Sequence, residues 1–216
     1  MKILSVQPLT IPDVKIIKFV RFADERGYFA ETLRIQDLTT APKLPELHDS
    51  KFYQMNESYS KKNVIRGLHI QWDPHMGKLV RVIDGSILDF ALDVRVGSQT
   101  FGKIVIHELV FDLVSDSLDW IWVPPGFAHG FLTTSEFARI EYVCTGWWNP
   151  LCERGIDIFN GDIDWSLANQ NLVEKAKASF PKAIMNDKDR NGLSLQVWKQ
   201  SEDAQKFTGS LPKIKQ

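Results

Sequence analysis

Two histidines lie in apolar, strand-like stretches of this chain, each with a glycine nearby. His69 stands two residues after a glycine, and His129 stands directly before one. Such surroundings predict imidazoles that line the inside of a β-structure, where they could exchange protons with a substrate. His69 is the stronger candidate base because Arg66 and Lys78 lie near it, and clustered ionisable groups shift one another's pKa. The alternative for either histidine is a purely structural role.

Cationic side chains near His69 could bind a phosphate-bearing substrate. Arg26 lies in a tight acidic turn, and Arg66 and Lys78 flank the strand that carries His69. Guanidinium and ammonium groups suit a diphosphate, although solvated charges at the rim of a barrel are the alternative. Strict alternation along a strand places Arg66 and His69 on opposite faces. Both can serve one site only if the strand bulges near Gly67; otherwise Arg66 serves a second pocket.

A histidine presented by a proline-glycine turn, as His129 is, could also be a metal ligand. The earlier strand offers only His69 and the amide of Gln71, and His75 lies in a loop after a proline. Three converging nitrogen or oxygen ligands are hard to assemble from this set. We therefore expect no catalytic metal.

Trp147 and Trp148 form an aromatic pair close in sequence to Tyr142. Such a pair could stack on a nucleotide base or a sugar ring. The alternative is that they form part of the barrel wall, which is the expectation for at least one of the two.

Composition limits the class of protein. The chain has 216 residues and a formal net charge of -1 at pH 7, which fits one domain and gives no electrostatic reason to expect nucleic acid as a partner. No apolar run is long enough to cross a membrane, and the N-terminus lacks the apolar core of a signal peptide. Two cysteines, Cys144 and Cys152, are too few for a disulfide framework. We expect a cytoplasmic protein with reduced thiols and no membrane partner.

Short strands separated by turn residues run from about residue 14 to residue 144, a pattern typical of an antiparallel sandwich or barrel. The expected strands are 16–22, 28–33, 52–58, 64–72, 78–83, 87–96, 103–113, 120–123 and 138–145.

The segment 87–96 alternates clearly, so we expect Leu88 and Phe90 on a packed face and Asp89 and Asp93 on a polar face. A polar helix is expected at 167–179, ending at Phe180 and Pro181. The C-terminal region is expected to cover or flank the barrel rather than to form a second core.

Six ordered blocks of residues recur in a known family: 24–31, 54–58, 66–71, 77–82, 93–102 and 125–131. Through them the chain resembles the dTDP-4-dehydrorhamnose 3,5-epimerases, sugar-nucleotide epimerases of the cupin superfamily, from residue 16 to about residue 189. The resemblance implies an all-β fold, a cupin-type double-stranded β-helix or jelly roll with a few peripheral helices, mainly C-terminal. It also implies one domain over 1–216, with the barrel at about 14–146 and a covering segment at 147–216.

The resemblance implies a role for each matching residue. His69 matches the base that removes a proton from the sugar, and Asp189 matches the carboxylate that orients it. Tyr142 matches the proton donor, and Lys78 matches a lysine near the sugar ketone. The residues expected to contact substrate are Arg26, Phe29, Glu31, Gln54, Asn56, Arg66, Gln71, His129, Trp147, Glu153 and Lys188.

The chemistry of such a substrate agrees with these residue types. A ketone at C4 acidifies the hydrogens at C3 and C5, because the carbanion left behind is delocalised onto O4 as an enolate. One base, one acid on the opposite face and a cation or donor at O4 suffice. We therefore expect no cofactor, either redox or metal.

The chain departs from the family pattern in places. Trp147 and Trp148 stand where the family has two tyrosines, and the segment between Trp165 and Asn186 is longer. These departures leave three alternatives: an epimerase acting at one carbon, a 3,4-ketoisomerase, or a non-catalytic carbohydrate-binding module. The ketoisomerase is disfavoured because the strand near the sugar offers His69 alone. The resemblance also implies a homodimer with shared N-terminal strands, and a nucleotide sugar, with dTDP as the expected carrier, as the small-molecule partner.

Overall fold

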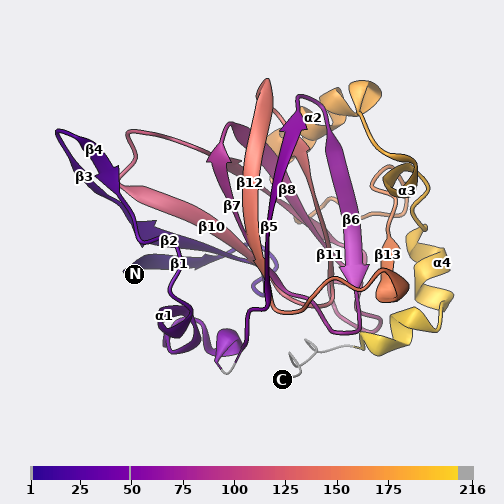
Figure 1. The fold of residues 1–216 in the computed structure, drawn as a ribbon. Helices are drawn as coiled ribbons and strands as arrows, with labels where there is room; N and C mark the ends of the chain where they lie inside the picture. Colours follow the sequence, from indigo (N-terminus) through magenta and orange to yellow (C-terminus); the bar gives the residue numbers. More distant parts are fainter. Residues whose placement is uncertain (1, 49, 209–216) are drawn as a thin grey trace.

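The computed structural model describes residues 2–48 and 50–208; residues 1, 49 and 209–216 of the expected domain lie outside this description. Two antiparallel sheets pack face to face (Figure 1). The six-stranded sheet has the order β1 (Ile3–Pro8), β2 (Lys15–Val20), β10 (Ser117–Val123), β7 (Lys78–Asp84), β12 (Phe137–Cys144) and β5 (Gln54–Lys61). The five-stranded sheet has the order β13 (Glu153–Gly155), β6 (Ile65–Gln71), β11 (Phe127–Thr133), β8 (Ser86–Asp93) and β9 (Ile104–Val110). This two-sheet jelly roll confirms the predicted all-β, cupin-type fold.

Two further strands, β3 (Phe22–Asp24) and β4 (Gly27–Phe29), form a separate two-stranded hairpin. In Figure 1 this hairpin projects from the six-stranded sheet, on the side away from β6 and β13. The sequence predicted one continuous strand over 16–22. The hydrogen-bonded strand instead ends at Val20, and Phe22 begins the hairpin.

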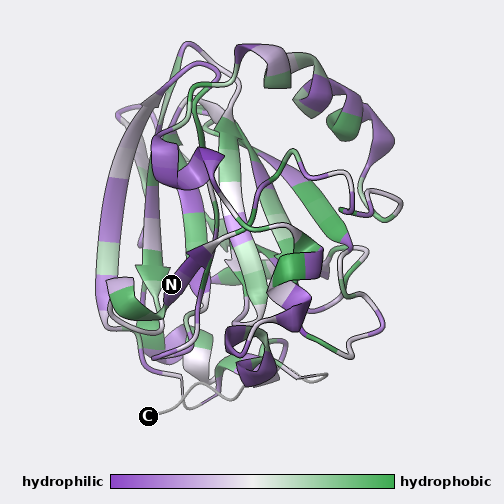
Figure 2. Ribbon diagram, turned by 90° about the vertical axis from the view of Figure 1, so that its right-hand side faces the viewer, coloured by the Kyte–Doolittle hydropathy of each residue, from purple (hydrophilic) through white to green (hydrophobic). Residues whose placement is uncertain are grey.

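The C-terminal segment covers the outer face of the five-stranded sheet. Its helices are α2 (Gln170–Ser179), α3 (Asp187–Arg190) and α4 (Leu195–Gln200), and the segment also has 3₁₀ turns at Pro150–Cys152, Phe180–Lys182 and Asp203–Lys206. Leu88 and Phe90 of β8 belong to one buried cluster with Trp198 and Phe207. The Trp198 indole also donates a 2.8 Å hydrogen bond to the carbonyl of Val94. Figure 2, which faces this side, shows green hydrophobic stretches of the strands behind the helices.

The remaining helices pack near the start of the chain: α1 (Ile35–Thr39) and the 3₁₀ turn Pro45–Leu47. Leu38 and Leu47 are buried there against Ile17 and Phe19 of β2. Among the helices of residues 2–48 and 50–208, none is long and apolar enough to cross a membrane.

The polar face of β8 is buried, which corrects the expectation drawn from its alternation. Leu88 and Phe90 pack under the C-terminal cover as predicted, but Asp89 and Asp93 point between the two sheets and are fully buried. The Asp93 carboxylate is stable in this interior because it accepts hydrogen bonds from Arg95 and from two nearby hydroxyls. Alternation showed that the two faces differ in polarity, but it does not say which face meets water.

Strand β6 carries one extra residue at Gly67. His69 pairs with His129 and Arg66 pairs with Phe131, so three steps along β6 match two steps along β11. Gly67 has φ of 101°, and a Cβ there would lie 2.6 Å from the His129 carbonyl oxygen. Because of this bulge, Arg66 and His69 face the same interior space.

Several boundaries differ from the sequence-based expectation. Strands β1, β11 and β13 were not among the expected strands. The helix expected from residue 167 begins at Gln170, because the side chain of Asn169 accepts hydrogen bonds from the next turn and caps it. Phe180 and Pro181 end the α-helix as predicted, and the chain continues there as a 3₁₀ turn.

Gly67→Ala tests the bulge. Gly97 also has positive φ but has nothing within 4 Å of the added Cβ, so Gly97→Ala is the matched control. We expect Gly97→Ala to lower the free energy of unfolding by about 1 kcal/mol and Gly67→Ala by at least about 3 kcal/mol, since only Gly67 adds a steric clash to the backbone penalty. Urea denaturation measures both, and equal losses would contradict the close packing of β6 on β11.

Candidate active site

A cavity, called the barrel cavity below, lies between the two sheets. It consists of two adjoining pockets that share His69, Lys78 and Tyr142. His69 comes from the five-stranded sheet, whereas Lys78 and Tyr142 come from the six-stranded sheet. The other lining residues are Ser58, Arg66, His129, Gly130, Phe131, Ile140, Asn186 and Asp189 in one pocket, and Gln54, Asn56, Met76, Cys144, Trp148, Glu153 and Lys188 in the other. An imidazole and a phenol therefore reach one space from opposite walls.

His69 is held by a buried carboxylate. Its Nε2 lies 2.6 Å from Oδ1 of Asp189, whose side chain is 2% exposed. Burial opposes ionisation of Asp189, but hydrogen bonds from His69 and from the Gly67 backbone hold the pKa of Asp189 below its usual range. The ionised carboxylate keeps the imidazole proton on Nε2, which leaves the Nδ1 lone pair available to accept a proton.

The short helix α3 places Asp189 beside the barrel. Asn186 caps this helix by accepting a 2.7 Å hydrogen bond from the backbone N–H of Asp189. The imidazole therefore lies on β6, and the carboxylate that holds it lies on the C-terminal segment, 120 residues later.

Tyr142 is suited to donate a proton. Burial, followed by the nearby acidic groups of Cys144 and Glu153, raises the pKa of Tyr142 above its usual range. The phenol therefore stays protonated at neutral pH. Burial also raises the pKa of the Cys144 thiol to about 11, so this group is a neutral part of the lining.

Three basic side chains of the barrel cavity can meet an anionic or polar ligand. Arg66 is fixed by hydrogen bonds to the Ser60 hydroxyl (2.9 Å) and the Tyr59 carbonyl (3.3 Å). His129 has Nε2 within 2.9 Å of the buried Asp89 carboxylate. The Lys78 side chain makes no hydrogen bond or ion pair within residues 2–48 and 50–208, so its ammonium can serve a ligand oxygen.

The second pocket is lined by linked polar groups. Gln54 donates to Asn56 (2.9 Å) and accepts from the backbone N–H of Trp148 (2.8 Å). Glu153 pairs with Lys188 and accepts a 3.4 Å hydrogen bond from the Trp148 indole. Although burial opposes its ionisation, the bond from Lys188 holds the pKa of Glu153 below its usual range. These groups offer donors and acceptors beside an aromatic face.

Two residues expected to contact substrate do not line the barrel cavity. Gln71 is buried and uses its amide to hold a loop, donating to the carbonyls of Pro74 and Trp147 and accepting from the backbone of Asn149. Trp147 is 58% exposed and packs edge-to-face on Tyr53. The following residue, Trp148, turns toward the cavity instead.

Three other expected contacts, Arg26, Phe29 and Glu31, also lie outside both pockets of the cavity. Arg26 pairs with Asp24 in the turn of the β3–β4 hairpin, and Glu31 pairs with Arg34. Figure 1 places the hairpin away from β6 and β13. These three side chains therefore do not line the cavity that His69 faces in their own chain.

Sequence reasoning did not assign Asp89 or Ser58 to the site, and of the tryptophan pair it selected Trp147 rather than Trp148 as a substrate contact. Asp89 orients His129, and the buried Ser58 hydroxyl lines the cavity with no hydrogen-bond partner in the described part of the chain. Alternation through Gln54 and Asn56 was a usable signal for Ser58, because these three residues share one face of β5. In the described ranges no three His, Cys, Asp or Glu side chains gather closely enough to hold a metal ion.

Acid stability tests the ionised state of Asp189. A carboxyl whose pKa is lower in the folded chain adds stability above its unfolded pKa of roughly 3.9 and loses it as the pH falls through the folded pKa. We expect Asp189→Asn to be about 1–2 kcal/mol less stable at pH 7 and to lose less stability than the native chain on acidification from about pH 5 to pH 3. Asp187→Asn, exposed on the same helix, is the control. If the free energies of unfolding of the native and Asp189→Asn chains change in parallel with pH, the pKa of Asp189 is not lowered by folding.

The chain is similar to known proteins in both sequence and fold. A sequence model of dTDP-4-dehydrorhamnose 3,5-epimerase matches residues 8–197. The protein of that name from Pseudomonas aeruginosa is 37% identical over 190 residues, which covers 87% of this chain and 93% of the relative. One from Neisseria gonorrhoeae is 41% identical over 173 residues, 79% of this chain, and the chain spans 50% of that relative's length. A crystal structure of dTDP-6-deoxy-D-glucose-3,5-epimerase from Legionella pneumophila, in complex with dTDP-4-keto-L-rhamnose, aligns with a TM-score of 0.75 at 32% identity and covers 96% of this chain and 99% of that one. The chain belongs to the dTDP-4-dehydrorhamnose 3,5-epimerase family.

Proposed function

We propose that this protein epimerises a dTDP-linked 4-keto-6-deoxy hexose at C3 and C5, in rhamnose-type deoxysugar biosynthesis. The observation that carries the proposal is that His69 and Tyr142 face one cavity from opposite sheets. Inversion of a carbon needs this arrangement, because a proton must leave one face of the sugar and return to the other. The Legionella relative with dTDP-4-keto-L-rhamnose bound supports the substrate class.

Each inversion proceeds through an enolate. His69 Nδ1 removes the proton next to the C4 ketone, and the C–H electron pair forms a carbon–carbon double bond while the carbonyl pair moves onto O4. The Lys78 ammonium stabilises this oxyanion, and Asp189 stabilises the imidazolium. Tyr142 then donates its proton to the opposite face of the carbon as the ketone re-forms. Solvent reloads Tyr142 and discharges His69 before the second carbon reacts.

A homodimer is the proposed active unit. Arg26, Phe29 and Glu31 match substrate contacts of the family but lie outside the barrel cavity of their own chain. A two-fold dimer would allow the projecting hairpin of one chain to reach the cavity of the other, since the same patch is used on both subunits. The substrate would then be bound by both chains.

Reduced thiols support a cytoplasmic location for this activity. Cys144 is buried, Cys152 is half-buried, and both are unpaired. Free thiols are typical of reducing compartments.

Incubation with dTDP-4-keto-6-deoxyglucose in heavy water tests the proposed function. We expect deuterium at both C3 and C5, read by proton NMR, because each inversion replaces a carbon-bound hydrogen with one from solvent. His69→Ala should slow exchange at both carbons by about 10²- to 10⁴-fold, the usual contribution of a general base. His48 is an exposed histidine outside the cavity, so His48→Ala is the matched control. It should catalyse deuterium exchange into the substrate at the native rate.

The other outcomes are distinct. Exchange at one carbon only would identify a single-carbon epimerase. Binding of dTDP without any exchange would identify a carbohydrate-binding module. A tenfold loss or less in His69→Ala would remove His69 from the role of base.

Replacing each tryptophan separately tests which one meets the substrate. Trp148 lines the barrel cavity, and Trp147 packs on Tyr53 outside it. We expect Trp148→Ala to raise KM by about tenfold through loss of an aromatic contact, and Trp147→Ala to change it by less than about threefold. Steady-state kinetics measures both. A larger effect at Trp147 would restore the assignment made from sequence.

A further inference from the structure

The β3–β4 hairpin has little support of its own. All six residues of its two strands are exposed, and Phe29 is 69% exposed. A two-stranded hairpin is marginally stable in water unless something else holds it. The proposed function nevertheless needs this hairpin in a defined direction, because it carries Arg26 and Phe29.

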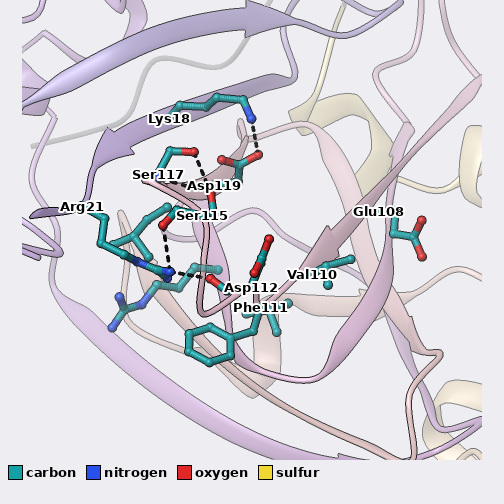
Figure 3. Close-up of a pocket in the computed structure, with 12 residues that line it drawn as sticks. Lys18, Arg21, Glu108, Val110, Phe111, Asp112, Ser115, Ser117 and Asp119 are labelled. Carbon is teal, nitrogen blue, oxygen red and sulfur yellow. Dashed lines mark hydrogen bonds and ion pairs between the residues drawn. The ribbon is translucent and has the colours of Figure 1, made fainter. Parts of the chain in front are cut away.

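Arg21, the single residue between β2 and β3, supplies such an anchor. It is 4% exposed, although both strands of the hairpin are exposed. Its guanidinium Nη1 donates to the carbonyls of Asp112 and Ser115, and its backbone N–H donates to the carbonyl of Asp116 at 2.8 Å. Figure 3 shows the side chain directed at this loop, which connects β9 to β10. The root of the hairpin is thereby tied to the body of the barrel.

The same guanidinium also holds a side chain of the hairpin. Its central carbon lies 4.0 Å from the ring centroid of Tyr28 and 5.6 Å from that of Phe111. Tyr28 pairs with Ala23, and Phe29 pairs with Phe22. Because successive residues of a strand point to opposite faces, holding Tyr28 against Arg21 turns Phe29 to the other face.

The partners of Arg21 explain why an arginine is needed. Within the described residues it forms no ion pair, and its charge is met by carbonyl oxygens and aromatic faces. A planar guanidinium can donate hydrogen bonds in its plane and stack with its face at the same time, whereas a lysine ammonium cannot.

We propose that Arg21 is a positioning residue for nucleotide-sugar binding, which acts by directing the hairpin that presents Arg26 and Phe29. This inference rests on the proposed function and on its dimer. Arg21 itself lies outside the barrel cavity, so the chemistry at His69 does not depend on it directly.

Steady-state kinetics of Arg21→Lys separates this role from a general structural one. We expect KM for the nucleotide sugar to rise about tenfold while kcat stays within about twofold, because binding is weakened and the proton-transfer groups are intact. Tyr28→Leu should reproduce this change, and Tyr28→Phe, which keeps the ring, should not. Lys18→Met is the control, since Lys18 lines the same pocket as Arg21 but pairs with Asp119. Its KM should stay native.

Hydrogen exchange gives a readout that does not depend on turnover. Backbone amides of residues 22–29 should exchange faster in Arg21→Lys than in the native chain, with the sheets unchanged. If these amides exchange at the native rate in Arg21→Lys, the anchoring role is wrong. A large fall in kcat alongside the rise in KM would overturn it as well. So would a rise in KM of the same size in Lys18→Met.

A heterodimer tests whether Arg21 acts on the partner's site. One chain carries Arg21→Lys and the other carries His69→Ala, with different affinity tags for purification. The intact cavity of the Arg21→Lys chain then receives the native hairpin of the His69→Ala chain. We expect native KM and about half the native kcat per dimer, since one of two symmetric sites is complete. A KM that stays raised overturns the inference while the function stands, whereas absence of turnover by the native protein overturns the proposed function instead.

Discussion

The extra residue in β6 at Gly67 is the constraint on which the site depends. A regular strand would send Arg66 and His69 to opposite faces, one of them away from the barrel cavity. With three residues of β6 set against two of β11, both side chains line the same pocket. Only glycine fits, because any Cβ would meet the backbone of β11. The positions of Arg66 and His69 relative to each other are therefore set by backbone geometry.

His69, the proposed base, depends on the C-terminal segment as well as on the barrel. Asp189 reaches His69 from a four-residue helix that is far too short to be stable alone. The segment around it is held by apolar packing of Trp198 and Phe207 on the outer face of β8. The outer face of that sheet thus secures the carboxylate, while its inner face supplies Asp89 and His129 to the interior. One sheet serves packing on one side and chemistry on the other.

Local patterns in the sequence were sufficient for the all-β fold class. The conflict between Arg66 and His69 left two alternatives, a bulge near Gly67 or a second pocket for Arg66, and the structure has the bulge. Other features depend on contacts that no local pattern encodes. Alternation could not tell that Asp89 and Asp93 face a second sheet rather than water. The choice between Trp147 and Trp148 is made by a loop that Gln71 holds through three hydrogen bonds. Nor could a local pattern show that Arg26 and Phe29 lie outside the barrel cavity of their own chain.

The proposed mechanism requires a base and an acid that act from opposite walls of one cavity. Tyr142→Phe tests it most directly, because this change keeps the aromatic ring and removes only the proton donor. In heavy water His69 can still remove a proton, exchange it with solvent and return deuterium to the same face. We expect inversion to fall by about 10²-fold or more while exchange at the same carbon persists, so that the ratio of exchange to inversion rises. Equal losses of exchange and inversion, with the ratio unchanged, would contradict it.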